Sequence, residues 1–138
     1  MTGLTEMEQR VLAELEEFWE ENVFSMLNTI IIDPAGDVEE VALLEQALRG
    51  LVERDYVVIG FEGFVPRNAE KLGKSASLEV VSKLANWFKF DPASSYWTLS
   101  KGDFRKERYP VIFSTPAGRT KASEILDKRG YQWWRPKK

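Results

Sequence analysis

Residues 37–60, DVEEVALLEQALRGLVERDYVVIG, have the pattern of a capped amphipathic helix followed at once by a short apolar strand. Asp37 and Glu40 have the three-residue spacing of a capping box. Residues 56–59 (YVVI) are strand formers and are bounded by Gly60. Between them, apolar residues recur every three or four positions and predict one buried helical face: Val41, Leu44, Leu48 and Leu51. We therefore expect a helix-to-strand unit around which the rest of the fold is arranged.

Composition indicates one globular domain that covers residues 1–138. The chain is long enough for one ordinary core, and its 43% hydrophobic and 30% charged residues lie far from the composition of disordered chains. The first ten residues lack the features of a secretory signal, and the apolar runs are far shorter than the roughly 20 residues that span a bilayer. We expect a cytoplasmic protein that does not contact a membrane.

Cysteine and histidine are both absent. Their absence excludes disulfides, Cys/His zinc sites and nucleophiles that depend on histidine. The carboxylates of Asp33, Asp37, Glu39 and Glu40 could gather around Mg²⁺, but helix capping already explains two of them. No glycine-rich phosphate loop or nucleophile elbow is present. We therefore expect a protein that is not an enzyme and has no cofactor or metal.

The net charge of −3 hides a strong asymmetry along the chain. Residues 1–69 contain 15 acids and 4 bases, whereas residues 70–138 contain 7 acids and 15 bases, so the halves carry −11 and +8. One interpretation is that the two halves attract each other within the fold. The other is that the basic half gathers its charges on one face and binds phosphate.

The flanking segments predict further elements. Thr5 and Glu8 form a second capping box, and helical apolar spacing from there to Phe24 predicts a long first helix. Residues 22–32 (NVFSMLNTIII) could continue that helix, form a second buried helix or enter a short strand, and we favour helix to about Ile30. Ser75 or Ser77 can cap a helix that extends through Phe88 and is stopped at residues 91–92 (DP). Residues 96–99 (YWTL) and 109–114 (YPVIFS) predict an antiparallel hairpin, and we expect residues 109–114 to pair also with the strand at residues 56–59, near Val111.

The C-terminal part predicts a closing helix. Residues 115–116 (TP) give an N-cap followed by proline at the first helical position, and Gly130 suits the position after the last turn. Three large aromatic residues follow, and exposing them would forfeit several kcal/mol of burial free energy. We expect Tyr131, Trp133 and Trp134 to pack against the domain.

Three segments together resemble the winged-helix regulators of the MarR and PadR kind. They are residues 4–6 with 11–12 (LTE and VL), 44–56 (LEQALRGLVERDY) and 113–126 (FSTPAGRTKASEIL). The resemblance implies an α+β fold with a small antiparallel sheet. Residues 38–54 would be the recognition helix, and residues 60–110 would form a wing enlarged by an extra helix.

The resemblance also implies a DNA-binding transcriptional regulator. Double-stranded DNA would contact Arg49 and Arg54 on the recognition helix, together with a basic cluster in the wing that is interleaved with aromatic residues. That cluster consists of Lys101, Arg105, Lys106 and Arg108. A homodimer would form through the first helix and the terminal segment, as in the regulators that the chain resembles.

The charge of the same helix predicts an alternative function. Glu39 and Glu40 lie at its leading end, with Glu45 and Glu53 farther along. Carboxylates there face phosphates and oppose the electrostatic term that supplies most DNA-binding free energy. The alternative is a non-catalytic protein-interaction module on a winged-helix scaffold.

Overall fold

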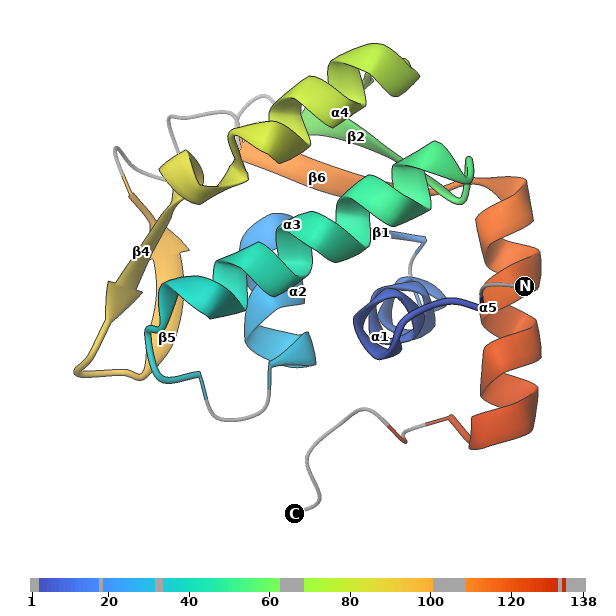
Figure 1. The fold of residues 1–138 in the computed structure, drawn as a ribbon, viewed down its shortest axis with the longest axis horizontal. Coiled ribbons are helices and arrows are strands. Elements are labelled where there is room, and N and C mark those ends of the chain that lie inside the picture. The colour runs from blue at the N-terminus through green and yellow to red at the C-terminus, as the bar shows by residue number, and fades with distance from the viewer. Residues whose placement is uncertain are drawn as a thin grey trace.

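The chain has an α+β fold in the computed structural model, which describes residues 3–17, 19–31, 34–62, 69–100, 109–131 and 133 (Figure 1). In this part of the chain, helices are interspersed with strands, and the strands form two antiparallel sheets. The elements are α1 (Glu6–Leu15), β1 (Glu20–Asn22), α2 (Val23–Ile30), α3 (Val38–Glu53), β2 (Val57–Glu62), β3 (Ala69–Lys71), α4 (Lys74–Ser82), the 3-10 helix η1 (Leu84–Trp87), β4 (Phe88–Asp91), β5 (Tyr96–Leu99), β6 (Tyr109–Ser114) and α5 (Pro116–Arg129).

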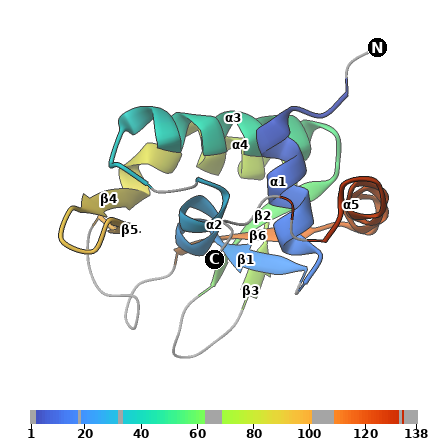
Figure 2. The ribbon, with the colours of Figure 1, turned by 90° about the horizontal axis from the view of Figure 1, so that it is seen from below.

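The larger sheet has the strand order β1-β6-β2-β3. β6 pairs with β2 through Val57↔Ser114 and Ile59↔Ile112, and with β1 through Glu20↔Phe113. The predicted pairing of residues 56–59 with the segment near Val111 is therefore confirmed for residues 57–59. Figure 2 shows α3 and α4 on one side of this sheet, α1 running from the level of α3 to that of β1, and α5 beside the end of the sheet.

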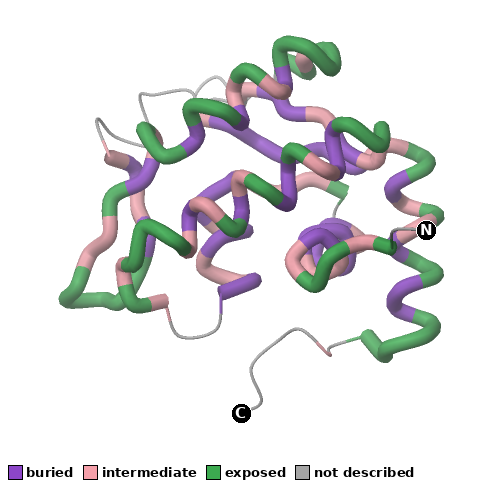
Figure 3. The backbone as a smooth tube through the Cα atoms, viewed as in Figure 1, coloured by how far each residue is buried: buried purple, intermediate pink, exposed green. Residues whose placement is uncertain are grey.

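The core lies between the helices and the sheet. The predicted stripe on α3 is buried, and apolar residues of α1, α2, β2 and β6 complete the cluster. Figure 3 shows these buried positions on the sides of the elements that face one another. None of the helices in the described ranges is both long enough and apolar enough to cross a membrane.

The predicted first helix, which would extend to Phe24, is too long, whereas the expected helix up to about Ile30 is confirmed as a second, buried helix, α2. α1 ends at Leu15, Trp19 adopts a left-handed conformation with φ of 64°, and residues 20–22 form β1. The side chain of Asn22 then caps α2 by accepting a hydrogen bond from the Ser25 amide at 2.8 Å. Pairing with β6 and this new cap outweigh the helical spacing, which is a local preference that tertiary contacts override.

The predicted hairpin between residues 96–99 and 109–114 is also wrong. β5 pairs with β4, with Phe88 opposite Leu99 and Phe90 opposite Trp97. Phe88 therefore lies in a strand that ends at Asp91, and Pro92 begins the turn of a hairpin instead of following the end of a helix. This β4–β5 hairpin buries Trp97 and packs Phe88 edge-on against Phe24 of α2, with ring centroids 5.1 Å apart.

The extra helix between β2 and β6 exists, but its predicted cap is wrong. Gly73 precedes α4 without a side-chain cap, whereas Ser77 lies buried inside the helix. The Ser77 hydroxyl accepts a hydrogen bond from the Ile59 amide at 3.0 Å. The Leu72 amide donates to the Ile59 carbonyl at 2.8 Å. Ser77 therefore satisfies a backbone donor of β2 where the short strand β3 has ended.

The capped start of α5 is confirmed. Thr115 accepts a hydrogen bond from the Gly118 amide at 3.0 Å, and its own hydroxyl lies 2.6 Å from the Asp55 carbonyl oxygen. Gly118 has no room for a side chain, because a Cβ there would collide with the Tyr56 carbonyl oxygen. The first turn of α5 is therefore held directly against the turn between α3 and β2.

The C-terminal aromatic residues behave differently from one another. Trp133 is half-buried and packs against Ala13 and Leu126. Tyr131 is 65% exposed, so the expected packing of this residue is wrong. Its hydroxyl instead donates a hydrogen bond to the Asp127 carboxylate at 3.2 Å. This contact is exposed, so it replaces little of the free energy that burial of the ring would have contributed. Trp134 lies outside the described residues.

Candidate functional site

Helix α3 presents an acidic and partly apolar surface to solvent. We call this surface the outer face of α3; it consists of Glu39, Leu43, Gln46, Arg49 and Glu53, all exposed. Leu43 is the apolar residue of this face, and it is 40% exposed. The guanidinium of Arg49 lies 3.9 Å from the Glu45 carboxylate, which offsets its charge. The outer face therefore has little positive potential.

The N-terminal end of α3 is occupied by the chain's own carboxylates. Asp37 accepts a hydrogen bond from the Glu39 amide at 3.0 Å, which confirms it as the cap. Glu40 does not complete a capping box; its carboxylate accepts from the Ala35 and Gly36 amides at 3.0 and 3.3 Å. Helix N-termini attract phosphate because their amides are unpaired. Here the Asp37 carboxylate takes one amide of the helix, and the Glu40 carboxylate places a second negative charge beside the same end.

The β4–β5 hairpin is fastened to this end of α3. The Trp97 indole donates to Glu40 Oε1 at 2.9 Å. The side-chain amide of Asn28 exchanges two hydrogen bonds with the Trp97 backbone, at 2.8 and 3.0 Å, in the manner of a neighbouring strand. Glu40 and Asn28 therefore connect the inserted hairpin to α3 and α2.

Of the basic residues predicted to contact DNA, only those on α3 lie within the described residues. Arg49 lies on the outer face of α3, and Arg54 is exposed at its C-terminal end, on either side of Glu53. The next residue, Asp55, pairs with Lys74 at 3.0 Å. The predicted wing cluster, Lys101, Arg105, Lys106 and Arg108, lies outside the described residues.

Two of the carboxylates considered for Mg²⁺ have other roles in the structure. Asp37 and Glu40 bond to backbone amides, and Asp33 is not among the described residues. In the described ranges, no three carboxylates are grouped in a way that would hold a metal ion.

A groove of about 390 Å³ separates the first turn of α1 from the middle of α3. Its floor contains the apolar residues Met7, Leu43 and Ala47, and its rim is polar: Thr5, Glu6 and Gln46. We call it the α1–α3 groove. The helices approach closely beside it, because Gly50 leaves space for the buried carboxylate of Glu8.

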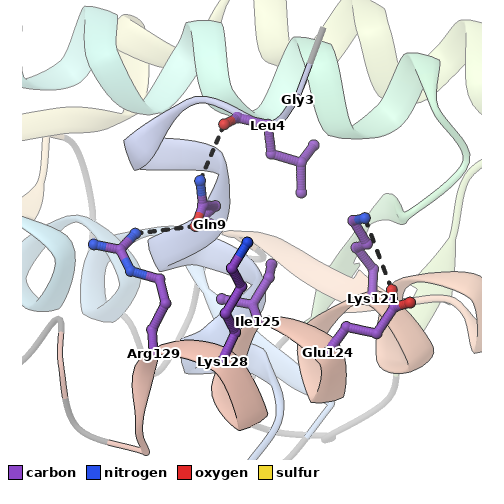
Figure 4. A pocket seen from close by; sticks show the side chains of 8 residues that line it. All are labelled: Gly3, Leu4, Gln9, Lys121, Glu124, Ile125, Lys128 and Arg129. Carbon is purple, nitrogen blue, oxygen red and sulfur yellow. Dashed lines mark hydrogen bonds and ion pairs between the residues drawn. The ribbon is translucent and has the colours of Figure 1, made fainter. Parts of the chain in front are cut away.

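A second cavity, of about 340 Å³, lies between α1 and α5, and we call it the α1–α5 cavity (Figure 4). Charged side chains of α5 surround an apolar floor to which α5 and the segment before α1 contribute. Its lining residues are Gly3, Leu4, Gln9, Lys121, Glu124, Ile125, Lys128 and Arg129.

Arg129 connects this cavity to α1. One of its terminal nitrogens donates to Glu6 Oε1 at 2.9 Å and to Gln9 Oε1 at 3.0 Å. Its guanidinium also lies over the Trp133 ring, 3.5 Å from the centroid. The hydrogen bond from Arg129 is the main cause that lowers the pKa of Glu6, so this carboxylate stays ionised.

Neither cavity was predicted from the sequence. Lys128 and Arg129 fit the preference for positive charge at the C-terminal end of a helix, so their positions in the sequence provided no reason to assign them to a binding site. The available signal was the spacing of Lys121, Ile125 and Lys128, which places all three on one side of α5. Which helix faces that side is decided by tertiary packing.

No protein-family profile matches the chain, and no curated protein or solved structure is significantly similar to it. The function must therefore be argued from these surfaces.

Replacing Glu40 with alanine tests whether this carboxylate holds the start of α3 together with the β4–β5 hairpin. The variant leaves the Trp97 indole and two backbone amides without an acceptor, so we expect Glu40→Ala to lower the free energy of unfolding by about 2 kcal/mol. Glu39→Ala, at the exposed neighbouring position, should cost less than about 1 kcal/mol. Urea unfolding followed by tryptophan fluorescence measures both; equal losses would contradict this role of Glu40.

Proposed function

We propose that the chain is a winged-helix-like domain that binds another protein through the outer face of α3 and the α1–α3 groove. Two connections support the scaffold: α3 runs directly into β2, and β6 runs directly into α5. β2 and β6 are antiparallel neighbours, as the two wing strands would be. The region between them carries α4 and the β4–β5 hairpin, which would make an enlarged wing.

The observation that carries the protein-binding proposal is the charge of the outer face of α3. Duplex DNA presents about one negative charge per 1.7 Å of its axis, so a reading surface gains affinity from arginine and lysine. Here Glu39 and Glu53 are exposed, and Arg49 lies near Glu45. The carboxylates of Asp37 and Glu40 add negative charge at the N-terminal end of α3. This surface complements positive charge better than phosphate.

The chemistry of the partner follows from the groove beside this face. An apolar floor inside a polar rim is the environment in which a single anchoring side chain contributes most to binding. Leu43 belongs to both surfaces, and Glu39 lies one helical turn before it. The partner we propose is therefore a basic segment with one apolar anchor, which places the anchor in the α1–α3 groove and its cations along α3.

Selection from a random displayed peptide library tests this proposal without a known partner. Peptides selected on the wild-type chain should be rich in lysine and arginine and contain one large apolar residue. Removing the anchor contact with Leu43→Asn, or reversing a charge of the outer face of α3 with Glu39→Lys, should weaken their binding about tenfold.

Two matched controls separate this site from general effects of charge and polarity. Val38→Asn changes an exposed apolar residue of α3 outside the groove, and Glu79→Lys reverses an exposed charge on α4. Both should leave affinity unchanged. Selected peptides that bind all four variants as well as wild type would refute the α3 site.

A second candidate function, DNA binding by a transcriptional regulator, is favoured by the position of the basic cluster. Residues 101–108 directly precede β6 and include Lys101, Arg105, Lys106 and Arg108. On a winged-helix scaffold they would lie in the wing. DNA would then be held mainly by the wing, with Arg49 and Arg54 making a minor contribution.

Salt dependence tests this second function. Affinity for mixed-sequence duplexes should fall steeply as salt rises, and the triple variant Arg105→Ala, Lys106→Ala, Arg108→Ala should reduce the slope of log affinity against log salt by about three. Replacing Arg49 and Arg54 together should change the slope by less than one. Fluorescence anisotropy of labelled duplexes measures both; no association at low salt would rule the function out.

A further inference from the structure

The α1–α5 cavity has the size and lining of a small-molecule site. We propose that it binds a small organic carboxylate with an apolar body. Its volume of about 340 Å³ lies at the lower end of the range that ligand pockets occupy, roughly 300–1,000 Å³. The occupant is therefore a compact molecule.

The floor of the cavity favours an apolar body. Leu4 comes from the segment before α1, and Ile125 comes from the middle of α5. Figure 4 shows the Leu4 side chain on the α1 side of the cavity and the Ile125 side chain on α5 between the two lysines. A hydrocarbon or aromatic group placed between them would remove apolar surface from water on both sides, at about 25 cal/mol per Å².

The rim supplies the charge that a carboxylate requires. Lys121 and Lys128 lie two turns apart on α5, and their side chains extend in the same direction in Figure 4. The Lys121 ammonium is 3.7 Å from the Glu124 carboxylate, a long and exposed contact that contributes little. Lys128 makes no ion pair with any residue in the described ranges, which leaves its ammonium available to a ligand.

The balance of charges selects a monoanion. Arg129 is committed to Glu6 and Gln9, so it forms a fixed wall of the cavity. Lys121 and Glu124 contribute opposite charges to the lining, so Lys128 leaves an excess of one positive charge. One carboxylate matches that excess. A dianionic phosphate would bring a second negative charge and more acceptor oxygens, which require additional hydrogen-bond donors.

Binding of simple probe acids tests the proposal by NMR of the labelled methyl groups of Leu4 and Ile125. Benzoate and octanoate should produce saturable shifts at both residues. Benzyl alcohol and octylamine, which keep the apolar bodies but replace the carboxylate, should bind at least about tenfold more weakly.

Three variants complete the test. Lys128→Gln should weaken benzoate binding about tenfold, and Leu4→Trp, which narrows the cavity with a larger side chain and keeps every charge, should weaken it as well. Lys83→Gln, at an exposed site on α4, should leave it unchanged. The proposal fails if benzoate and octanoate cause no saturable shift at Leu4 and Ile125. It also fails if benzyl alcohol binds as well as benzoate, or if Lys128→Gln and Lys83→Gln bind equally.

Discussion

Strand β6 holds together parts of the chain that are far apart in sequence. It pairs with β1 on one side and β2 on the other, and its last residues extend both contacts. The Ser114 amide donates to the Trp19 carbonyl at 2.8 Å, and the Thr115 amide donates to the Tyr56 carbonyl at 3.0 Å. Because Thr115 also caps α5, the same few residues position the end of α1, the end of α3 and the start of α5.

The two candidate binding surfaces depend on that arrangement. Once β6 has placed α1 between α3 and α5, the first turn of α1 borders both the α1–α3 groove and the α1–α5 cavity. Glu6 lines the groove, and its carboxylate bonds to Arg129, which lines the cavity. A ligand on one side and a partner on the other would therefore contact the same short segment. This proximity is a property of the packing and would exist even if each surface served a separate role.

Local sequence signals predicted the elements that depend on local interactions. Thr5, Asp37 and Thr115 cap helices as expected, and the helix-to-strand unit is present, because caps and helical stripes act within a few residues. β1 and β4 were predicted as helix because their strand character comes from pairing with other strands. The partner of β1 is β6, which is distant in sequence, and the partner of β4 is β5, which the sequence paired with residues 109–114 instead. The same reason hid Ser77 as the partner of Ile59, and hid both cavities, which exist only where two helices meet. Charge composition was readable, but the sequence could not show that Glu40 turns back to Ala35 and Gly36.

The pairing of β6 with β2 is best tested at Ile59 and Ile112. The amide and the carbonyl of Ile59 are bonded to Ser77 and Leu72, so its α-hydrogen points toward Ile112 across the antiparallel pair. A two-dimensional NMR experiment that detects nuclear Overhauser effects should give a strong cross-peak between the α-hydrogens of these two residues. Its absence, together with cross-peaks that join residues 96–99 to residues 109–114, would contradict this sheet and the positions of α1, α3 and α5 that follow from it.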